Sequence, residues 1–129
     1  MLDKIKILIV DDAPTMRSVI KGALVNAGFV NFDEADNGLV ALDKLNKDEF
    51  HLVLCDLDMP KMDGLGVLRD MRTTEKLENI PLIIISAIAK PEKVIQLIEE
   101  GVNDYIIKPI KPDALVQRVK DVLKDTKVI

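Results

Sequence analysis

The chain has almost none of the residues that stabilise small secreted proteins. Its 129 residues include a single cysteine, Cys55, and no tryptophan. One cysteine excludes an internal disulfide and fits a reducing compartment, so we expect a cytoplasmic protein. No apolar run approaches the roughly 20 residues that cross a bilayer, and the N-terminus does not resemble a signal peptide. We therefore expect no membrane association.

Blocks of like charge are also missing. Charged residues make up 31% of the chain, with a formal net charge of −4 spread along the sequence. Direct binding to nucleic acid requires a basic face, so we expect no nucleic-acid partner. Apolar residues make up 48% of the chain, which with this length is typical of one globular domain.

Strand-like and helix-like patterns alternate along the whole chain. Short apolar runs predict strands at 5–10, 31–35, 52–55, 82–85 and 104–107. Alternation of this kind is typical of a parallel sheet that is covered on both faces. We expect an α/β fold with five strands in the order 2-1-3-4-5 and five helices, a doubly wound flavodoxin-like sandwich.

The spacing of apolar residues also predicts which helix faces are buried. The first helix has an apolar stripe formed by Met16, Val19, Ile20, Ala23, Leu24 and Ala27. Val94, Leu97 and Ile98 are the corresponding residues of the fourth helix, which we expect to begin at Pro91. His51, the only histidine, is expected to be exposed.

Polar residues follow four of the predicted strands directly. Asp11 and Asp12 end the first strand, Asp56 the third, Ser86 the fourth and Lys108 the fifth. The carboxyl ends of parallel strands share one edge of the sheet, where ligands bind. Clustered carboxylates bind a cation or take up protons, and hard oxygen ligands suit Mg²⁺. A turn with a helix cap before Pro14 is the alternative explanation for the Asp11–Asp12 pair alone.

Three segments together resemble the receiver domain of two-component response regulators, the CheY-like family, in its stand-alone form. The first is Asp56–Gly64, with Met59, Pro60, Met62 and Asp63; the others are Gly101–Tyr105 and Lys108–Pro109. The resemblance covers nearly the whole chain. It implies a single receiver domain over residues 1–129 without an output domain.

The resemblance also implies the chemistry of the site. Asp56 would accept a phosphoryl group from a histidine kinase or a phosphotransfer protein, and would also lose that group slowly to water. Asp12, Asp56 and the backbone carbonyl of Asp58 would bind Mg²⁺ directly, whereas Asp11 would act mostly through water. Lys108 and Ser86 would contact the phosphoryl group. The Lys108–Pro109 bond is expected to be cis.

By the same resemblance, phosphorylation becomes a signal through Ser86 and Tyr105. Ser86 would move towards the phosphoryl group and Tyr105 would favour a buried rotamer. The face formed by the fourth helix, fifth strand and fifth helix would then change its affinity for a target protein. A chemotaxis pathway is the leading expectation and a sporulation-type phosphorelay is the alternative. We expect a monomer or a weak dimer.

Three other functions fit parts of the sequence. Asp56 and Asp58 are also spaced like the first motif of haloacid-dehalogenase-like phosphatases, which would hydrolyse a generic phosphate ester in multiple turnovers. A flavodoxin would share the topology, but the acidic first loop would repel a flavin phosphate. A receiver that is never phosphorylated is the third alternative, and the complete set of pocket residues argues against it.

Overall fold

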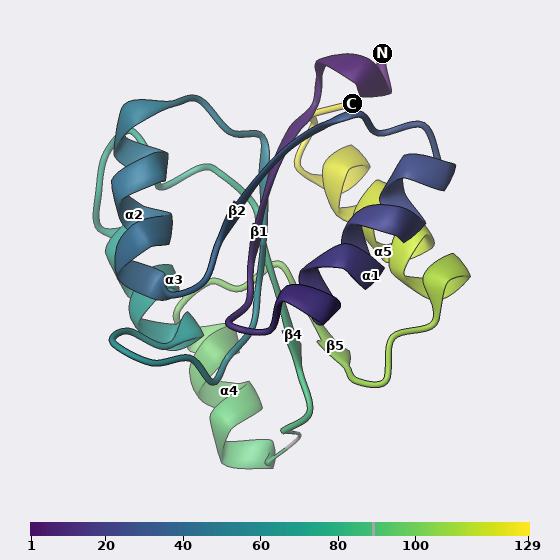
Figure 1. Ribbon diagram of the computed structural model, residues 1–129. Helices are drawn as coiled ribbons and strands as arrows, with labels where there is room; N and C mark the ends of the chain where they lie inside the picture. Colours follow the sequence, from purple (N-terminus) through teal and green to yellow (C-terminus); the bar gives the residue numbers. More distant parts are fainter. Residues whose placement is uncertain (89) are drawn as a thin grey trace.

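The computed structural model describes residues 1–88 and 90–129, which form a five-stranded parallel sheet between two layers of helices (Figure 1). The strands are β1 (Lys6–Val10), β2 (Asn31–Ala35), β3 (Leu52–Cys55), β4 (Leu82–Ser86) and β5 (Asp104–Ile107). Their order is β2-β1-β3-β4-β5. Both the predicted fold class and the predicted strand order are confirmed.

Five α-helices connect the strands: α1 (Pro14–Asn26), α2 (Gly38–Lys47), α3 (Gly64–Arg72), α4 (Pro91–Glu99) and α5 (Pro112–Asp125). A short 3₁₀ turn, Leu2–Lys4, precedes β1. Helices α1 and α5 cover one face of the sheet, while α2, α3 and α4 cover the other (Figure 1). Each face has its own apolar core, because alternate residues of the central strands point to opposite sides. No helix in the described residues has both the length and the apolar character to cross a membrane.

The helices begin where local chemistry favours a start. Proline occupies the first turn of α1, α4 and α5, where its missing N–H is not needed for a helical hydrogen bond. The Asn37 side chain accepts a hydrogen bond from the Val40 N–H at the start of α2, and Asp63 accepts one from the Gly66 N–H at the start of α3. The Asn37 and Asp63 caps and the adjoining loops place these two helices close to the carboxyl ends of β1 and β3.

Two residues predicted to be buried are exposed. Val19 of α1 is 49% exposed and Ile98 of α4 is 62% exposed. Each lies next to a buried residue in the sequence: Val19 precedes Ile20 and Ile98 follows Leu97. A step of one residue turns the side chain by about 100° around the helix, which carries it past the edge of the contact. The apolar pattern therefore overestimated how wide the buried face of each helix is.

The prediction for His51 is also wrong. Its ring is only partly exposed, and Nδ1 accepts a hydrogen bond from the Lys6 N–H at 2.9 Å. The histidine therefore joins the start of β1 to the segment before β3, at the edge of the sheet opposite the acidic residues.

Arg72, the last residue of α3, ties together two loops at that opposite edge. Its guanidinium donates to the carbonyls of Gly101, Glu78 and Ile80 and to Oδ1 of Asn103. Burial of the guanidinium lowers the pKa of Arg72 from its ordinary value. The guanidinium joins the end of α3 to the segments around 78–80 and 101–103, so it contributes to folding rather than to the site.

We expect the substitution Arg72→Met to lower the free energy of unfolding by about 3 kcal/mol, because several carbonyl acceptors lose a charged donor together. Urea denaturation measures this change. Arg69→Met is the matched control, since Arg69 lies on the same helix and forms an exposed ion pair with Glu100. Arg69→Met should lower the free energy of unfolding by less than about 1 kcal/mol. Equal losses in the two variants would contradict the structural role of Arg72.

Candidate functional site

Extensions of the sheet hold the backbone of the acidic residues. The Asp11 N–H donates to the carbonyl of Ala35, which continues the pairing of β1 with β2. The Asp56 N–H donates to the carbonyl of Val10, which continues the pairing of β1 with β3. Because both aspartates are fixed by strand pairing, their carboxylates leave neighbouring strands at the same edge.

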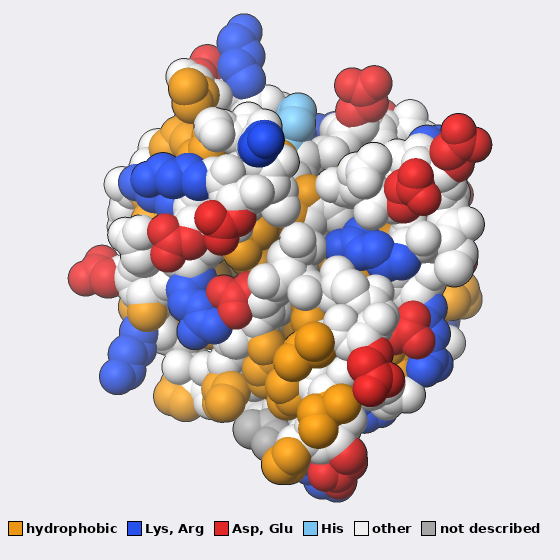
Figure 2. Space-filling view, turned by 180° about the vertical axis from the view of Figure 1, so that it is seen from behind, with side chains coloured by type: hydrophobic (Ala, Val, Ile, Leu, Met, Phe, Trp, Pro, Cys, Tyr) orange, Lys and Arg blue, Asp and Glu red, His pale blue; other side chains and the backbone are white. Residues whose placement is uncertain are grey.

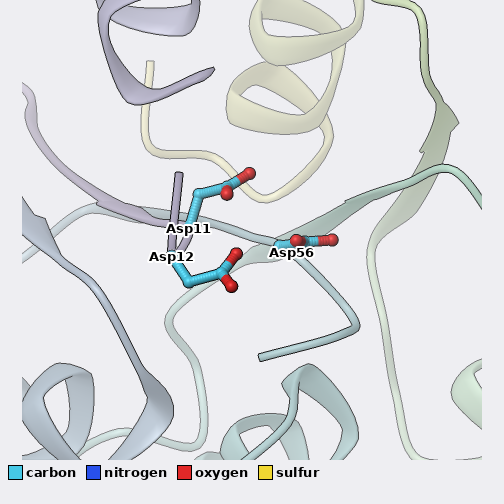
Figure 3. A group of neighbouring side chains, drawn as sticks. All are labelled: Asp11, Asp12 and Asp56. Carbon is cyan, nitrogen blue, oxygen red and sulfur yellow. The ribbon is translucent and has the colours of Figure 1, made fainter. Parts of the chain in front are cut away.

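The three predicted carboxylates lie together. Oxygen atoms of Asp11, Asp12 and Asp56 all lie within 4.8 Å of one another, and the Asp12 carboxylate is directed towards Asp56 (Figure 3). Asp11 is 1% exposed and Asp56 is 7% exposed, whereas Asp12 lies at the surface. Buried carboxylates this close repel one another unless a cation lies between or beside them. A cluster of hard oxygen donors, open on one side, fits Mg²⁺, which keeps several waters when bound.

Lys108 is the cation that the chain itself supplies. Its ammonium lies 3.1 Å from Oδ2 of Asp11 and 3.5 Å from Oδ2 of Asp56. Burial alone would lower the pKa of Lys108, but the hydrogen bond to Asp11 and the charge of Asp56 outweigh it and raise the pKa. The lysine therefore stays charged between the two buried acids. The Lys108–Pro109 bond that follows is cis, as predicted.

Asp56 is less acidic than an ordinary aspartate. Burial raises the pKa of its carboxyl group, the charge of Asp11 raises it further, and Lys108 opposes both effects. In the folded, metal-free protein the ionised form of Asp56 is therefore held at a cost in free energy. A divalent cation that binds the carboxylates would remove this cost.

We expect Asp56→Asn to stabilise the metal-free protein at neutral pH by about 1–2 kcal/mol, because it removes one of the clustered negative charges. The pKa of Asp56 is raised in the folded state, so in the window above its ordinary value of 3.8 the folded protein binds more protons than the unfolded chain. Wild type therefore gains stability relative to the variant as pH falls through that window. Urea denaturation at a series of pH values, with a chelator present, measures the difference.

The control for this pH series is Asp58→Asn, which removes an exposed carboxylate from the loop after β3. Because this variant keeps the Asp56 carboxylate, it should retain the gain in stability that wild type shows at acidic pH. If the difference in free energy of unfolding between Asp56→Asn and wild type stays constant across the acidic range, the account is contradicted.

Close packing around two glycines positions the loop between β3 and α3. A Cβ atom at Gly64 would lie 2.5 Å from the carbonyl oxygen of Asp56, and one at Gly38 would lie 2.6 Å from the carbonyl oxygen of Met62. The Gly64 N–H donates to the Leu57 carbonyl, and the Gly38 N–H donates to that of Met62. The loop that carries Asp58 is thus held against the start of α2. The close approach at Gly38 was not predicted from the sequence.

The tip of the same loop adopts a strained conformation. The Met62 N–H donates to the carbonyl of Pro60 at 2.7 Å, and Lys61 between them has a φ of 68°. A left-handed residue at the centre of such a three-residue turn is disfavoured for a side chain with a Cβ. Asp58 precedes this turn and its side chain is exposed.

Ser86 and Tyr105 lie on the neighbouring strands β4 and β5. Ser86 is buried, and its Oγ accepts a hydrogen bond from the Ile88 N–H at 3.1 Å. Its hydroxyl proton remains available for another acceptor. The Tyr105 hydroxyl oxygen is buried without a hydrogen-bond partner in residues 1–88 and 90–129.

Comparison with known proteins agrees with this geometry. The family description "Response regulator receiver domain" matches residues 7–120 of the chain. The chain belongs to this family. The receiver therefore belongs to two-component signalling, which confirms the resemblance found in the sequence and leaves the phosphatase and flavodoxin alternatives without support.

Curated relatives of the receiver include several chemotaxis proteins. It is 42% identical over 119 residues to chemotaxis protein CheY-3 of Vibrio cholerae, with 92% of each chain covered. It is 39% identical to chemotaxis protein CheY of Pseudomonas aeruginosa, covering 92% of this chain and 96% of the relative.

Solved structures give the same fold. A CheY-like receiver domain protein of Methanospirillum hungatei superposes with a TM-score of 0.88 at 26% identity, covering 95% of this chain and 96% of that one. The chemotaxis response regulator CheY4 of Vibrio cholerae superposes with a TM-score of 0.85 at 28% identity, covering 92% and 98%. The (βα)5 arrangement of this receiver is therefore that of CheY-like structures.

Proposed function

We propose that this receiver accepts a phosphoryl group on Asp56 in a Mg²⁺-dependent reaction and passes the signal to a partner protein. The observation that carries the proposal is the joint placement of three carboxylates and one lysine at the carboxyl edge of the sheet. Membership of the response regulator receiver family and the similarity to CheY proteins support it.

The chemistry needs a nucleophile that reaches solvent. Asp56 is largely buried but stands beside the exposed Asp12. One Asp56 oxygen attacks the phosphorus of a donor such as phosphohistidine, and the phosphorus–nitrogen bond breaks as the phosphorus–oxygen bond forms. The imidazole leaves with the electron pair and takes up a proton. The product is an acyl phosphate on Asp56.

Most of the catalysis in such a transfer is positioning and charge stabilisation. Asp12, Asp56 and the backbone carbonyl of Asp58 would hold Mg²⁺ directly, and Asp11 would act through water. When bound, the ion offsets negative charge on the transferred group and lowers the repulsion between carboxylates. Lys108 supplies a second positive charge, and the Ser86 hydroxyl donates a hydrogen bond to a phosphoryl oxygen.

The signal leaves the site through β4 and β5. Ser86 of β4 pairs with Ile107 of β5, and Ile84 pairs with Tyr105. A displacement of Ser86 would therefore displace the paired residues of β5. The surface beyond these strands includes exposed apolar side chains, Ile95 and Ile98 of α4 and Ile107 of β5. Figure 2 shows hydrophobic side chains gathered over the lower part of this view, around α4. The phosphoryl group stabilises the arrangement of Ser86 and Tyr105 that favours partner binding at this face.

The partners follow from the reaction. A histidine kinase or a phosphotransfer protein is the phosphodonor, and a target protein binds the α4–β5–α5 face. The names of the relatives favour a chemotaxis pathway. We further propose that the receiver works in the cytoplasm as a monomer or weak dimer.

The experiment is incubation of the wild-type protein with Mg²⁺ and a small phosphodonor such as phosphoramidate. We expect about one phosphoryl group per chain, stable to acid and labile to base, and no incorporation with a chelator present. A phosphate ester such as p-nitrophenyl phosphate is tested in parallel and should not be turned over. Rapid multiple turnover of that ester would instead support a hydrolase, and the absence of any incorporation would contradict the proposal.

A further inference from the structure

Arg17 of α1 makes a two-point contact beside the acidic cluster. Its Nη1 donates to the backbone carbonyl of Asp11 at 2.5 Å, and its Nε donates to Oε1 of Glu34 on β2 at 2.8 Å. The Arg17 side chain is 16% exposed and that of Glu34 is 40% exposed, so the guanidinium is largely shielded from water while its carboxylate partner still reaches it. Neither bond involves a carboxylate of the cluster itself.

The other polar groups of Asp11 are held by different parts of the chain. Its N–H pairs with Ala35, its Oδ1 accepts the Ala13 N–H at 2.9 Å, and its Oδ2 contacts Lys108. Only the carbonyl depends on Arg17. That carbonyl belongs to the planar peptide unit between Asp11 and Asp12, so its direction fixes the positions of the Asp12 N and Cα atoms.

The direction of the Asp12 carboxylate is set by the backbone, whereas the carboxylates of Asp11 and Asp56 also contact Lys108. Its carboxylate is exposed, and in the part of the chain that the structure describes no side chain forms an ion pair or hydrogen bond with it. The direction of the Asp12 carboxylate towards Asp56 therefore comes from the peptide unit rather than from a side-chain partner (Figure 3).

We infer that Arg17 is a positioning residue for divalent-cation binding: it fixes the peptide between Asp11 and Asp12, and Glu34 holds the guanidinium in place. This inference rests on the proposed function, because it assumes that the acidic cluster binds Mg²⁺. Residues that orient metal ligands from outside the coordination shell typically change metal affinity by about 10- to 100-fold when replaced.

Charge alone predicts the opposite result. Arg17 is a cation close to a cation-binding cluster, so its removal would strengthen Mg²⁺ binding if only electrostatic repulsion mattered. A positioning role predicts weaker binding. The two explanations therefore differ in the sign of the effect.

The test measures Mg²⁺ affinity by isothermal titration calorimetry for wild type, Arg17→Lys and Arg17→Met. Lysine keeps the charge but cannot make the planar two-point contact, and methionine loses both. We expect both variants to bind Mg²⁺ about tenfold more weakly than wild type. Urea denaturation in the presence of a chelator establishes that each variant is folded at the titration temperature.

Lys44→Met is the matched control. Lys44 of α2 makes the same kind of contact on the same strand, to Oδ1 of Asp33 and to the carbonyl of Glu34, but it does not touch Asp11. Its Mg²⁺ affinity should equal or slightly exceed that of wild type. Equal affinity in wild type and Arg17→Lys, or tighter binding in Arg17→Met, would overturn the role of Arg17. No Mg²⁺ binding by wild type would overturn the proposed metal site itself.

Discussion

Asp56→Asn is expected to abolish phosphoryl incorporation while the fold is retained. The asparagine amide has nearly the shape of the carboxylate but is a far weaker nucleophile, and it contributes no negative charge to the cation site. The backbone bond from residue 56 to the Val10 carbonyl does not depend on the side chain, so the sheet should be unchanged. Gel-shift or radiolabel measurement with phosphoramidate and Mg²⁺ should show no modified protein.

Asp58→Asn serves as the control for this loss as well. Its side chain is exposed in the loop after β3, and the proposed metal contact there uses the backbone carbonyl. This variant should still be phosphorylated on Asp56. Incorporation into Asp56→Asn at a rate near that of wild type would assign the nucleophile to another residue.

Lys108→Ala is expected to separate phosphorylation from signalling. The variant leaves Asp11 and Asp56 without the cation that lies between them, so the metal-free free energy of unfolding should fall by about 2 kcal/mol. Mg²⁺ should recover much of that loss, because the ion replaces the missing positive charge. The conformational response to phosphorylation should be lost, since the proposed contact between the Lys108 ammonium and the phosphoryl group is removed.

Tyr105 offers a direct readout of that response. It is the only tyrosine in a chain without tryptophan, so the intrinsic fluorescence reports on this one ring. Adding Mg²⁺ and beryllofluoride, a phosphoryl mimic, should change the fluorescence of wild type but not that of Lys108→Ala. Lys47→Ala, which removes an exposed lysine of α2, is the control and should respond as wild type does. A normal fluorescence change in Lys108→Ala would remove the lysine from the switch.

Much of the site was predictable because parallel strands end at a common edge. Asp11, Asp56 and Lys108 each follow an apolar run, and a shared sheet edge is enough to bring such residues together. The strand order, the edge position of 31–35 and the cis bond before Pro109 were all expected and are present. The strand order was expected from the alternation of elements, whereas the cis bond was expected from the resemblance to receiver domains.

Contacts made by side chains outside the strand ends were not predictable in the same way. The bond from Arg17 to the Asp11 carbonyl depends on how the first loop turns, and the approach of Met62 to Gly38 depends on the path of a second loop. Neither path is encoded by hydrophobic periodicity. The exposure of Val19 and Ile98 shows a related limit, because apolar spacing indicates the centre of a buried face better than its edges.

The buried Tyr105 hydroxyl bears on the proposed switch. Within residues 1–88 and 90–129 it has no hydrogen-bond partner, and an unpaired buried hydroxyl costs free energy. Under the proposed function, a phosphoryl group would act by favouring one placement of Tyr105 over another.

Reductive trapping of the phosphorylated residue tests the account most directly. Sodium borohydride converts an aspartyl phosphate into homoserine, and mass spectrometry of the peptides locates the change. After incubation with phosphoramidate and Mg²⁺, we predict homoserine at residue 56 alone, and none when a chelator replaces Mg²⁺. Conversion at Asp11, Asp12 or Asp58 instead, or equal conversion at residue 56 without the metal, would contradict the Mg²⁺-assisted transfer to Asp56.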